Sequence, residues 1–159
     1  EGKPAPGIVV QAPVGMYKAR LTVDGKSQEH SFELKMNPNE EYTAEDSAKR
    51  FELWWRLRSI FERSNQEITA AMETAQKAGE DSEIAKRAYE FAGKLVPQGA
   101  TLSEIANEPP KMLSKLTTVS SMLFHSEGPP TQSAYEVVDQ MEKLIDAEIE
   151  AWKEFKSQN

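Results

Sequence analysis

The order of hydrophobic and polar residues divides the chain into two parts, which meet near Pro38 and Asn39. In the first part apolar and polar residues alternate, which is the two-residue period of a half-buried strand. In the second part apolar residues recur at three- and four-residue steps, as on an amphipathic helix. The pattern predicts an α+β protein that is mainly α, with a short antiparallel β-hairpin element of two or three strands over residues 1–39, packed on a four-helix bundle over residues 40–159.

The alternation is clearest over residues 17–23, where Tyr, Ala, Leu and Val are separated by Lys, Arg and Thr. Asp24-Gly25 follows, and both residues tolerate the positive φ angles of a two-residue hairpin turn. The return strand has an apolar face made by Phe32, Leu34 and Met36. Two or three strands are not stable alone. We therefore expect the helices to cover the apolar face, and missing strands or a second copy to complete the free edge.

Capping residues, prolines and glycines mark four expected helices. The first begins at the capping box of Thr43 and Asp46 and ends near Gly79, and the others follow residues 81–82, 109–110 and 129–131. The first and last helices are the longest and should form the frame. The expected core residues are Trp54, Leu57, Phe61, Ser64, Ile68, Ala71, Ala75, Ile84, Ala88, Phe91, Leu95, Met112, Leu116, Val119, Met122, Leu123, Val138, Met141, Ile145 and Trp152.

Composition narrows the classes of function. The chain has 159 residues, a net charge of -7, no cysteine and two histidines. The lack of cysteine excludes disulfides, thiolate nucleophiles and cysteine-ligated metal sites. The acidic balance argues against nucleic acid and against anionic membrane surfaces as partners. No stretch approaches the roughly 20 apolar residues of a membrane span.

Residues 12–25, APVGMYKARLTVDG, resemble the closing hairpin of a FlgD-type immunoglobulin-like domain. Residues 116–122, the Pro-Pro-Thr at 129–131 and the long helix with Trp152 resemble the helical tail that follows this hairpin in one family. That family is the bacterial proteins with BNR or sortilin-like β-propeller repeats. Two positions depart from the usual hairpin, with Val14 where a second Pro is common and Met16 where Thr is common. The propeller repeats and the earlier immunoglobulin-like strands are missing from this sequence.

The resemblance implies that the chain is the C-terminal part of a larger secreted or periplasmic protein. Its hairpin would be the remnant of an immunoglobulin-like domain. Its partners would be its own upstream propeller or immunoglobulin-like domain, or a second copy in a homodimer. The expected function is a non-enzymatic structural and interaction module for packing, dimerisation or partner contact. Any activity of the propeller does not transfer to this chain.

The sequence offers little support for catalysis. His30 lies in an expected strand and His125 at an expected helix end. Ser121 or Ser126 could be combined with His125, but no strand-to-helix nucleophile elbow surrounds them. His125 is better explained as a cation near a helix C-terminus, where the helix dipole favours it. We expect no catalytic residue and no enzymatic activity.

A ladder of acidic residues occupies one face of the last helix, at Glu142, Asp146, Glu150 and Glu154. A weak calcium site or a surface for a cationic partner is one interpretation, but an isolated ladder lacks the loop carbonyls of a calcium shell. We expect instead a solvated outer face that repels itself slightly. Di-metal sites need Glu-x-x-His on helices, and this motif is lacking, as are glycine-rich phosphate loops. We expect no metal and no cofactor.

Trp54 and Trp55 are adjacent, so only one of them can face the bundle core. Trp54 fits the core stripe, and we expect Trp55 to pack against the hairpin, with an exposed contact as the alternative. The first helix also carries a cluster of cations, namely Lys49, Arg50, Arg56, Arg58 and Arg63. Acidic residues lie between them, which argues against a phosphate-binding stripe. Trp55 and Arg58 are the candidate contacts for a ligand or partner. The alternative function is binding of a cell-wall glycan or peptide by Trp55 and the loop at residues 97–109.

Overall fold

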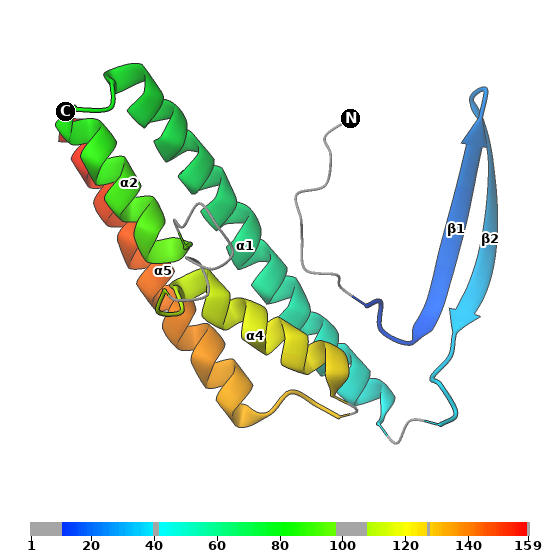
Figure 1. Ribbon diagram of the computed structural model, residues 1–159. Coiled ribbons are helices and arrows are strands. Elements are labelled where there is room, and N and C mark those ends of the chain that lie inside the picture. The colour runs from blue at the N-terminus through cyan, green and yellow to red at the C-terminus, as the bar shows by residue number, and fades with distance from the viewer. Residues whose placement is uncertain (1–10, 40–41, 98–107, 127, 159) are drawn as a thin grey trace.

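The computed structural model describes residues 11–39, 42–97, 108–126 and 128–158, and Figure 1 shows their arrangement. Within them, strands β1 (Gly15–Val23) and β2 (Lys26–Leu34) precede helices α1 (Ala44–Ala78), α2 (Glu83–Leu95), α4 (Met112–His125) and α5 (Gln132–Gln158). The expected fold class, α+β and mainly α with a short antiparallel hairpin and four helices, is confirmed. The hairpin lies on the N-terminal side of residues 39–40 and the four described helices on the C-terminal side.

The hairpin forms for the local reason that the sequence indicates. β1 and β2 pair antiparallel in a register that joins Val23 to Lys26 across a two-residue turn. Asp24 has φ of 50° and Gly25 has φ of 77°. Both central residues of the turn are therefore in the left-handed region, as the twist of a two-residue hairpin requires.

The helix ends follow the expected capping chemistry. Thr43 Oγ1 accepts a hydrogen bond from the Asp46 amide at 3.1 Å, and an Asp46 carboxylate oxygen accepts one from the Thr43 amide at 2.9 Å. The bond from the Thr43 backbone, with a second from its hydroxyl, lowers the pKa of the Asp46 carboxyl. Ser82 caps α2 through its side chain, and Gly79, with φ of 87°, ends α1. Each reciprocal bond satisfies an amide that the helix itself leaves without a partner.

The four helices form an irregular bundle framed by α1 and α5. α1 and α5 run parallel, because their cross-connections advance together along both helices: Arg56 meets Glu142, Arg63 meets Asp146 and Glu67 meets Lys153. Figure 1 shows α2 and α4 running in the opposite direction, one after the other, along the length of this pair. α2 and α4 thus lie end to end in the place that a single helix would take in a cross-section of the bundle. The result differs from a regular up-down bundle.

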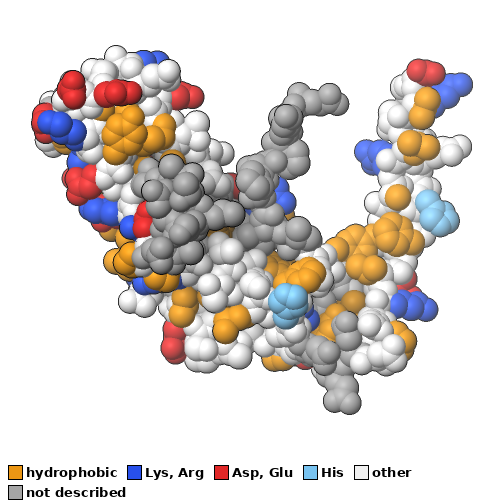
Figure 2. Space-filling model, in the orientation of Figure 1, with side chains coloured by type: hydrophobic (Ala, Val, Ile, Leu, Met, Phe, Trp, Pro, Cys, Tyr) orange, Lys and Arg blue, Asp and Glu red, His pale blue; other side chains and the backbone are white. Residues whose placement is uncertain are grey.

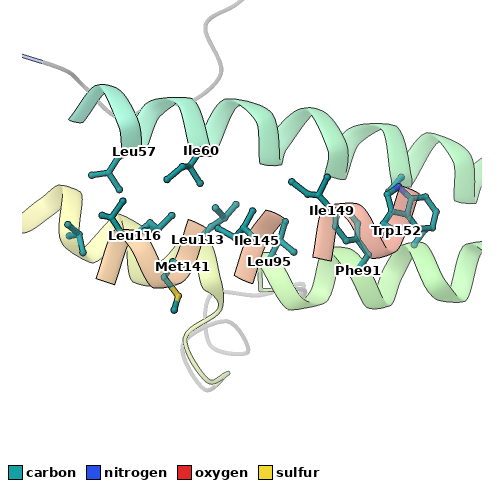
Figure 3. Packing of buried hydrophobic residues seen from close by; sticks show 14 of the residues in the cluster. Leu57, Ile60, Phe91, Leu95, Leu113, Leu116, Met141, Ile145, Ile149 and Trp152 are labelled. Carbon is teal, nitrogen blue, oxygen red and sulfur yellow. The ribbon is translucent and has the colours of Figure 1, made fainter. Parts of the chain in front are cut away.

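One continuous hydrophobic core runs between the helices, and Figure 3 shows part of it. Phe91 of α2 and Trp152 of α5 stack with ring centroids 5.8 Å apart. Ser64 is fully buried and donates its hydroxyl to the Ile60 carbonyl oxygen at 2.7 Å, which satisfies it inside the helix. Most of the expected core residues are buried or packed against this cluster. The exception is Met122, whose side chain is 67% exposed, so its predicted place in the core is wrong.

The hairpin extends away from the bundle as a two-stranded arm (Figure 1). No Cα atom of β1 or β2 lies within 8 Å of one in a described helix. Leu21 is 66% exposed, and Val23, Phe32 and Leu34 are also exposed. The expectation that the helices cover the apolar face of this hairpin is therefore wrong. The apolar stripes of the helices pack on one another instead.

Candidate functional site

The hairpin has one apolar face and one polar face. Residues directly opposite in an antiparallel pair share a face, and the faces alternate along each strand. The register pairs Tyr17 with Phe32, whose rings stack 5.9 Å apart, and places Leu21 and Val23 on the same face. We call this the apolar hairpin face; its apolar members are Tyr17, Ala19, Leu21, Val23, Phe32 and Leu34, and its polar members, all on β2, are Lys26, Gln28 and His30. Figure 2 shows hydrophobic side chains along the arm that no described helix covers in that view.

The opposite face is polar and held by paired side chains. Arg20 forms an ion pair with Glu29 directly across the strands, and the Thr22 and Ser27 hydroxyls are 2.8 Å apart. Both pairs are solvent exposed, so each contributes little to stability. The two faces therefore differ, although the polar face includes the exposed Met16 and the apolar face includes polar residues of β2.

The two outer edges of the hairpin also differ in charge. In a two-residue hairpin the pair beside the turn exchanges hydrogen bonds, and bonded and non-bonded pairs then alternate. Val23 and Lys26 are the bonded pair beside the turn. Counting from this pair, the residues whose backbone N–H and C=O groups point away from the partner strand are those with side chains on the polar face. On β1 these residues include Lys18 and Arg20, and on β2 they include Glu29 and Glu33. A basic edge and an acidic edge are thus both open to a further strand.

Contacts at its base fix where the arm leaves the bundle. The Val14 amide donates to Ser47 Oγ of α1 at 3.3 Å. The Tyr17 hydroxyl donates to the Pro13 carbonyl oxygen at 2.6 Å, which closes the turn that enters β1. The hairpin is therefore attached to the N-terminal end of α1 through the segment that precedes it.

Trp55 and Arg58, the predicted contact residues, lie together on the outer face of α1. Trp55 is 57% exposed, stacks on Phe51 with ring centroids 6.0 Å apart, and has the Arg58 guanidinium 5.8 Å from its ring centre. Arg58 also donates to Glu62 at 2.8 Å. Trp55 is exposed and does not pack against the hairpin, so that expectation is wrong, and its alternative as a contact residue stays a prediction. The loop at residues 97–109 falls largely outside the described residues.

The histidines and serines considered for catalysis are not assembled into a site. His30 is exposed on β2, and His125 ends α4 with its ring edge-on to Phe124 at 5.2 Å between centroids. The Ser126 hydroxyl donates to the Leu123 carbonyl oxygen at 3.3 Å, and so caps a carbonyl group at the end of α4. The position of His125 at a helix C-terminus is as the sequence indicates.

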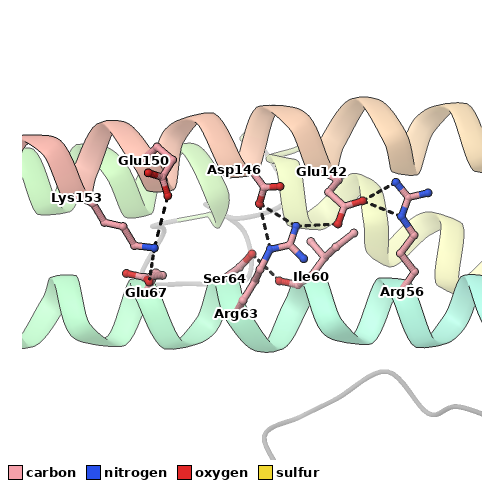
Figure 4. A network of polar contacts seen from close by, with 9 residues as sticks. All are labelled: Arg56, Ile60, Arg63, Ser64, Glu67, Glu142, Asp146, Glu150 and Lys153. Atoms are coloured by element: carbon pink, nitrogen blue, oxygen red, sulfur yellow. Dashed lines mark hydrogen bonds and ion pairs between the residues drawn. The ribbon is translucent and has the colours of Figure 1, made fainter.

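The acidic ladder on α5 is only in part the solvated outer face that the spacing suggested, because its first two members face α1 (Figure 4). Glu142 accepts from Arg56 Nε at 2.7 Å and from Arg63 Nη2 at 2.9 Å, and Asp146 accepts from Arg63 Nη2 at 2.8 Å. Glu142 and Asp146 thus face cations of α1, whereas Glu150 contacts Lys153 of its own helix and Glu154 is exposed. Arg56 therefore reaches across to α5 instead of pairing with Glu52 on its own helix.

This pairing governs the titration of Glu142. Partial burial raises the pKa of its carboxyl, but hydrogen bonds from Arg56 and Arg63 outweigh that effect and hold the pKa below its usual value. The carboxylate stays ionised and bridges two arginines. Its function is to join α1 to α5, which is a structural contribution.

Arg50 is the residue that sequence reasoning misplaced most clearly. We expected it in a cluster of cations interleaved with acids on the first helix, yet its side chain is only 6% exposed. Its guanidinium lies between the rings of Tyr42 and Trp54, 5.2 Å and 5.3 Å from their centres. The spacing could have revealed this, because Arg50, Trp54 and Leu57 stand at the four- and three-residue steps of the core stripe.

Among the described residues there is no group of three or more His, Asp or Glu side chains that could hold a metal ion. No described helix is both long and apolar enough to cross a membrane.

Comparison with known proteins gives no match: no family model fits the sequence, and no curated protein or solved structure is significantly similar to it. The resemblance of residues 12–25 to an immunoglobulin-like hairpin stays a prediction.

Proposed function

We propose that this chain is a non-enzymatic structural and interaction module at the C-terminus of a larger secreted or periplasmic repeat protein. Its hairpin completes a β-sheet, and its bundle acts as the anchor of that hairpin. The strands that receive the hairpin belong to the chain's own upstream domain or to a second copy. Packing, dimerisation or partner contact is the result.

The uncovered apolar hairpin face is the observation that carries this proposal. Two strands alone are marginally stable in water, whereas three or more strands with a buried face are stable. Leu21 and Val23 are on this face, exposed, in a register that leaves the opposite face polar. Water-exposed apolar surface of this kind marks an interaction site. The free β1 and β2 edges add the main-chain donors and acceptors of strand addition.

The test combines solution mass with amide hydrogen exchange. Light scattering after size-exclusion chromatography gives the mass over a range of concentrations, and exchange reports the opening of the hairpin amides. A dimer with protected amides in β1 and β2 indicates that a second copy receives the hairpin. A monomer whose hairpin amides exchange rapidly while the bundle is protected indicates that upstream strands do.

A pair of matched variants locates the interface. Leu21→Lys puts a charge on the apolar hairpin face, and Thr22→Lys puts the same charge one residue later on the polar face. If a dimer forms, the first variant should abolish it and the second should preserve it. A strict monomer with well-protected hairpin amides would overturn the proposal, because the hairpin would then be stable without a partner.

A second candidate function is the binding of a cell-wall glycan or peptide at Trp55. It is supported by the exposed indole, flanked by Phe51 and by the guanidinium of Arg58. Aromatic rings with a nearby donor suit ligands that have both apolar and polar surfaces. Trp54 and Trp152 are buried, so quenching of fluorescence by soluble glycan fragments should come from Trp55. Quenching that survives in Trp55→Leu would eliminate this candidate.

A further inference from the structure

A cleft of about 340 Å³ lies between the base of the hairpin and the first turns of α1. Its hairpin side includes Val14, Leu34 and Lys35, and its helix side includes Ser47, Arg50 and Trp54. This volume falls at the lower end of the range for small-molecule sites. Apolar side chains provide much of the wall, and a few polar groups are placed among them. The cleft is separate from the Trp55 surface and shares only Leu34 with the apolar hairpin face.

We infer that this cleft binds an organic carboxylate, with the guanidinium of Arg50 and the indole N–H of Trp54 as donors. The inference is independent of what completes the hairpin.

The state of Arg50 is the first support. It is 6% exposed, and no described carboxylate lies within ion-pair distance of it. Its Nη2 donates to the Leu123 carbonyl oxygen at 2.8 Å, but its buried Nε has no hydrogen-bond partner among the described residues. A buried cation without a counter-ion is costly, and a guanidinium presents several donors in a fixed plane that matches a carboxylate.

Trp54 supplies the second, separate observation. Its side chain is 2% exposed, and its indole Nε1 also lacks a partner in the described part of the chain. Buried donors are normally satisfied, so two orphaned N–H groups on residues lining one cleft need an explanation. Both N–H groups are buried, so an oxygen anion entering the cleft reaches them only if the side chains around them shift.

The charge around the cleft favours an anion. Lys35 adds a second cation at the rim, where its Nζ is 3.6 Å from Glu33. None of the described lining residues is acidic. The first turn of α1 carries Glu45 and Asp46, so the dipole of this helix adds no further attraction for an anion. The apolar part of the wall selects an organic acid over a fully hydrated inorganic ion.

The test follows the tryptophan indole groups in two-dimensional ¹H–¹⁵N spectra of the full chain, because the chain has three tryptophans. Sodium benzoate should shift the Trp54 indole signal in a saturable way, with a dissociation constant on the order of 1 mM. Trp152 is the internal control, since its indole Nε1 is also buried without a described partner but lies at the other end of the bundle. Benzamide is the neutral control of the same shape.

Two variants assign the donors. Arg50→Gln should weaken benzoate binding by at least about tenfold, because a charged hydrogen bond is lost. Lys35→Glu should weaken benzoate binding severalfold, because it reverses the charge at the rim of the cleft. Lys35 is exposed, so this variant should fold and can test the inference even if Arg50→Gln does not fold.

Equal shifts with benzoate and benzamide, or with sodium chloride at the same ionic strength, would overturn the inference. So would inorganic phosphate binding more tightly than benzoate, or benzoate binding that appears only after Glu40→Gln and Glu41→Gln. The last result would mean that the chain's own carboxylates satisfy Arg50.

Trialanine and its C-terminal amide distinguish the source of the carboxylate. Tighter binding of trialanine than of benzoate points to a peptide C-terminus as the ligand, and the reverse order points to a small free acid.

Discussion

Arg50 donates from Nη2 to the carbonyl oxygen of Leu123 at 2.8 Å, and this bond joins the start of α1 to the last turn of α4. The last carbonyls of a helix have no partner within it, and a cation is favoured there by the helix dipole. The two residues are 73 positions apart, so the bond forms only when α1 and α4 are packed. A side chain of one helix thus caps the end of another.

Replacing Arg50 should destabilise the bundle. Arg50→Leu removes this charged hydrogen bond from a buried position and leaves the Leu123 carbonyl oxygen with only the longer bond from the Ser126 hydroxyl, and we expect a loss of about 2 kcal/mol in the free energy of unfolding. Urea denaturation followed by circular dichroism measures it. Arg58→Leu, at an exposed arginine on the same helix, should change stability by no more than about 0.5 kcal/mol. Similar losses from both variants would contradict a specific role for the Arg50 bond.

Glu142 should make stability depend on pH. Its pKa in the folded state is lowered by the hydrogen bonds from Arg56 and Arg63, which outweigh partial burial. The resulting stability is complete above the usual pKa of 4.5 and is lost as the pH falls through the lower folded-state pKa. Glu142→Gln should therefore cost about 1 kcal/mol at neutral pH, and progressively less in acid.

Denaturation at several pH values checks this expectation. Glu154→Gln is the matched control, because Glu154 is a ladder member on the same helix and is exposed. It should behave as the unmodified protein throughout. A deficit in Glu142→Gln that is as large at pH 3 as at pH 7 would show that the arginine pairing is not its cause.

The stack of Phe91 on Trp152 should be a major part of the core. Both side chains are fully buried, and their ring centroids are 5.8 Å apart. Phe91→Ala removes a ring from a packed interior, with an expected cost of roughly 3–5 kcal/mol, including the cavity. Tyr89→Ala, at an exposed ring on the same helix, should cost much less. Thermal unfolding of the two variants side by side measures the difference, and equal losses would contradict the special weight of the stack.

The hairpin should unfold separately from the bundle. Gly25 has φ of 77° in the turn, so Gly25→Val forces a β-branched residue into the left-handed region at a cost of roughly 1–2 kcal/mol. Amide exchange in β1 and β2 should accelerate, while the melting temperature of the helices stays unchanged, because the strands do not contact them.

Asp24→Asn is the control for that turn, since Asn also tolerates positive φ. It should leave exchange in the hairpin nearly unaltered. A lower melting temperature of the helices in Gly25→Val would indicate that the hairpin stabilises the bundle, contrary to the open arrangement.

Local features of the chain could be predicted from the sequence. The turn at Asp24 and Gly25, the capping box of Thr43 and Asp46 and the cap at Ser82 depend on residues that are close together along the chain. The core stripes follow from periods of 3.6 and 2, which are properties of single helices and strands. The fold class follows from the same two periods, because each part of the chain has one of them throughout.

Contacts between distant elements were not accessible in this way. Periodicity shows which face of an element is apolar, but not what packs against that face. A hairpin whose apolar face is covered and one whose apolar face is exposed therefore have the same sequence pattern. Spacing alone likewise places Glu142 and Arg56 on exposed surfaces of separate helices. Only the parallel arrangement of α1 and α5 brings the two together.

The amino-acid order is thus sufficient for the elements, their ends and most of their buried faces, because these depend on local backbone geometry and side-chain period. Three features depend on the packed molecule: Arg50 turns inward to Leu123 and the cleft, Glu142 and Asp146 face arginines, and the hairpin stands free of the described helices. Each of these is set by the relative position of elements far apart in the chain. That position results from packing the whole core, to which each of the four described helices contributes.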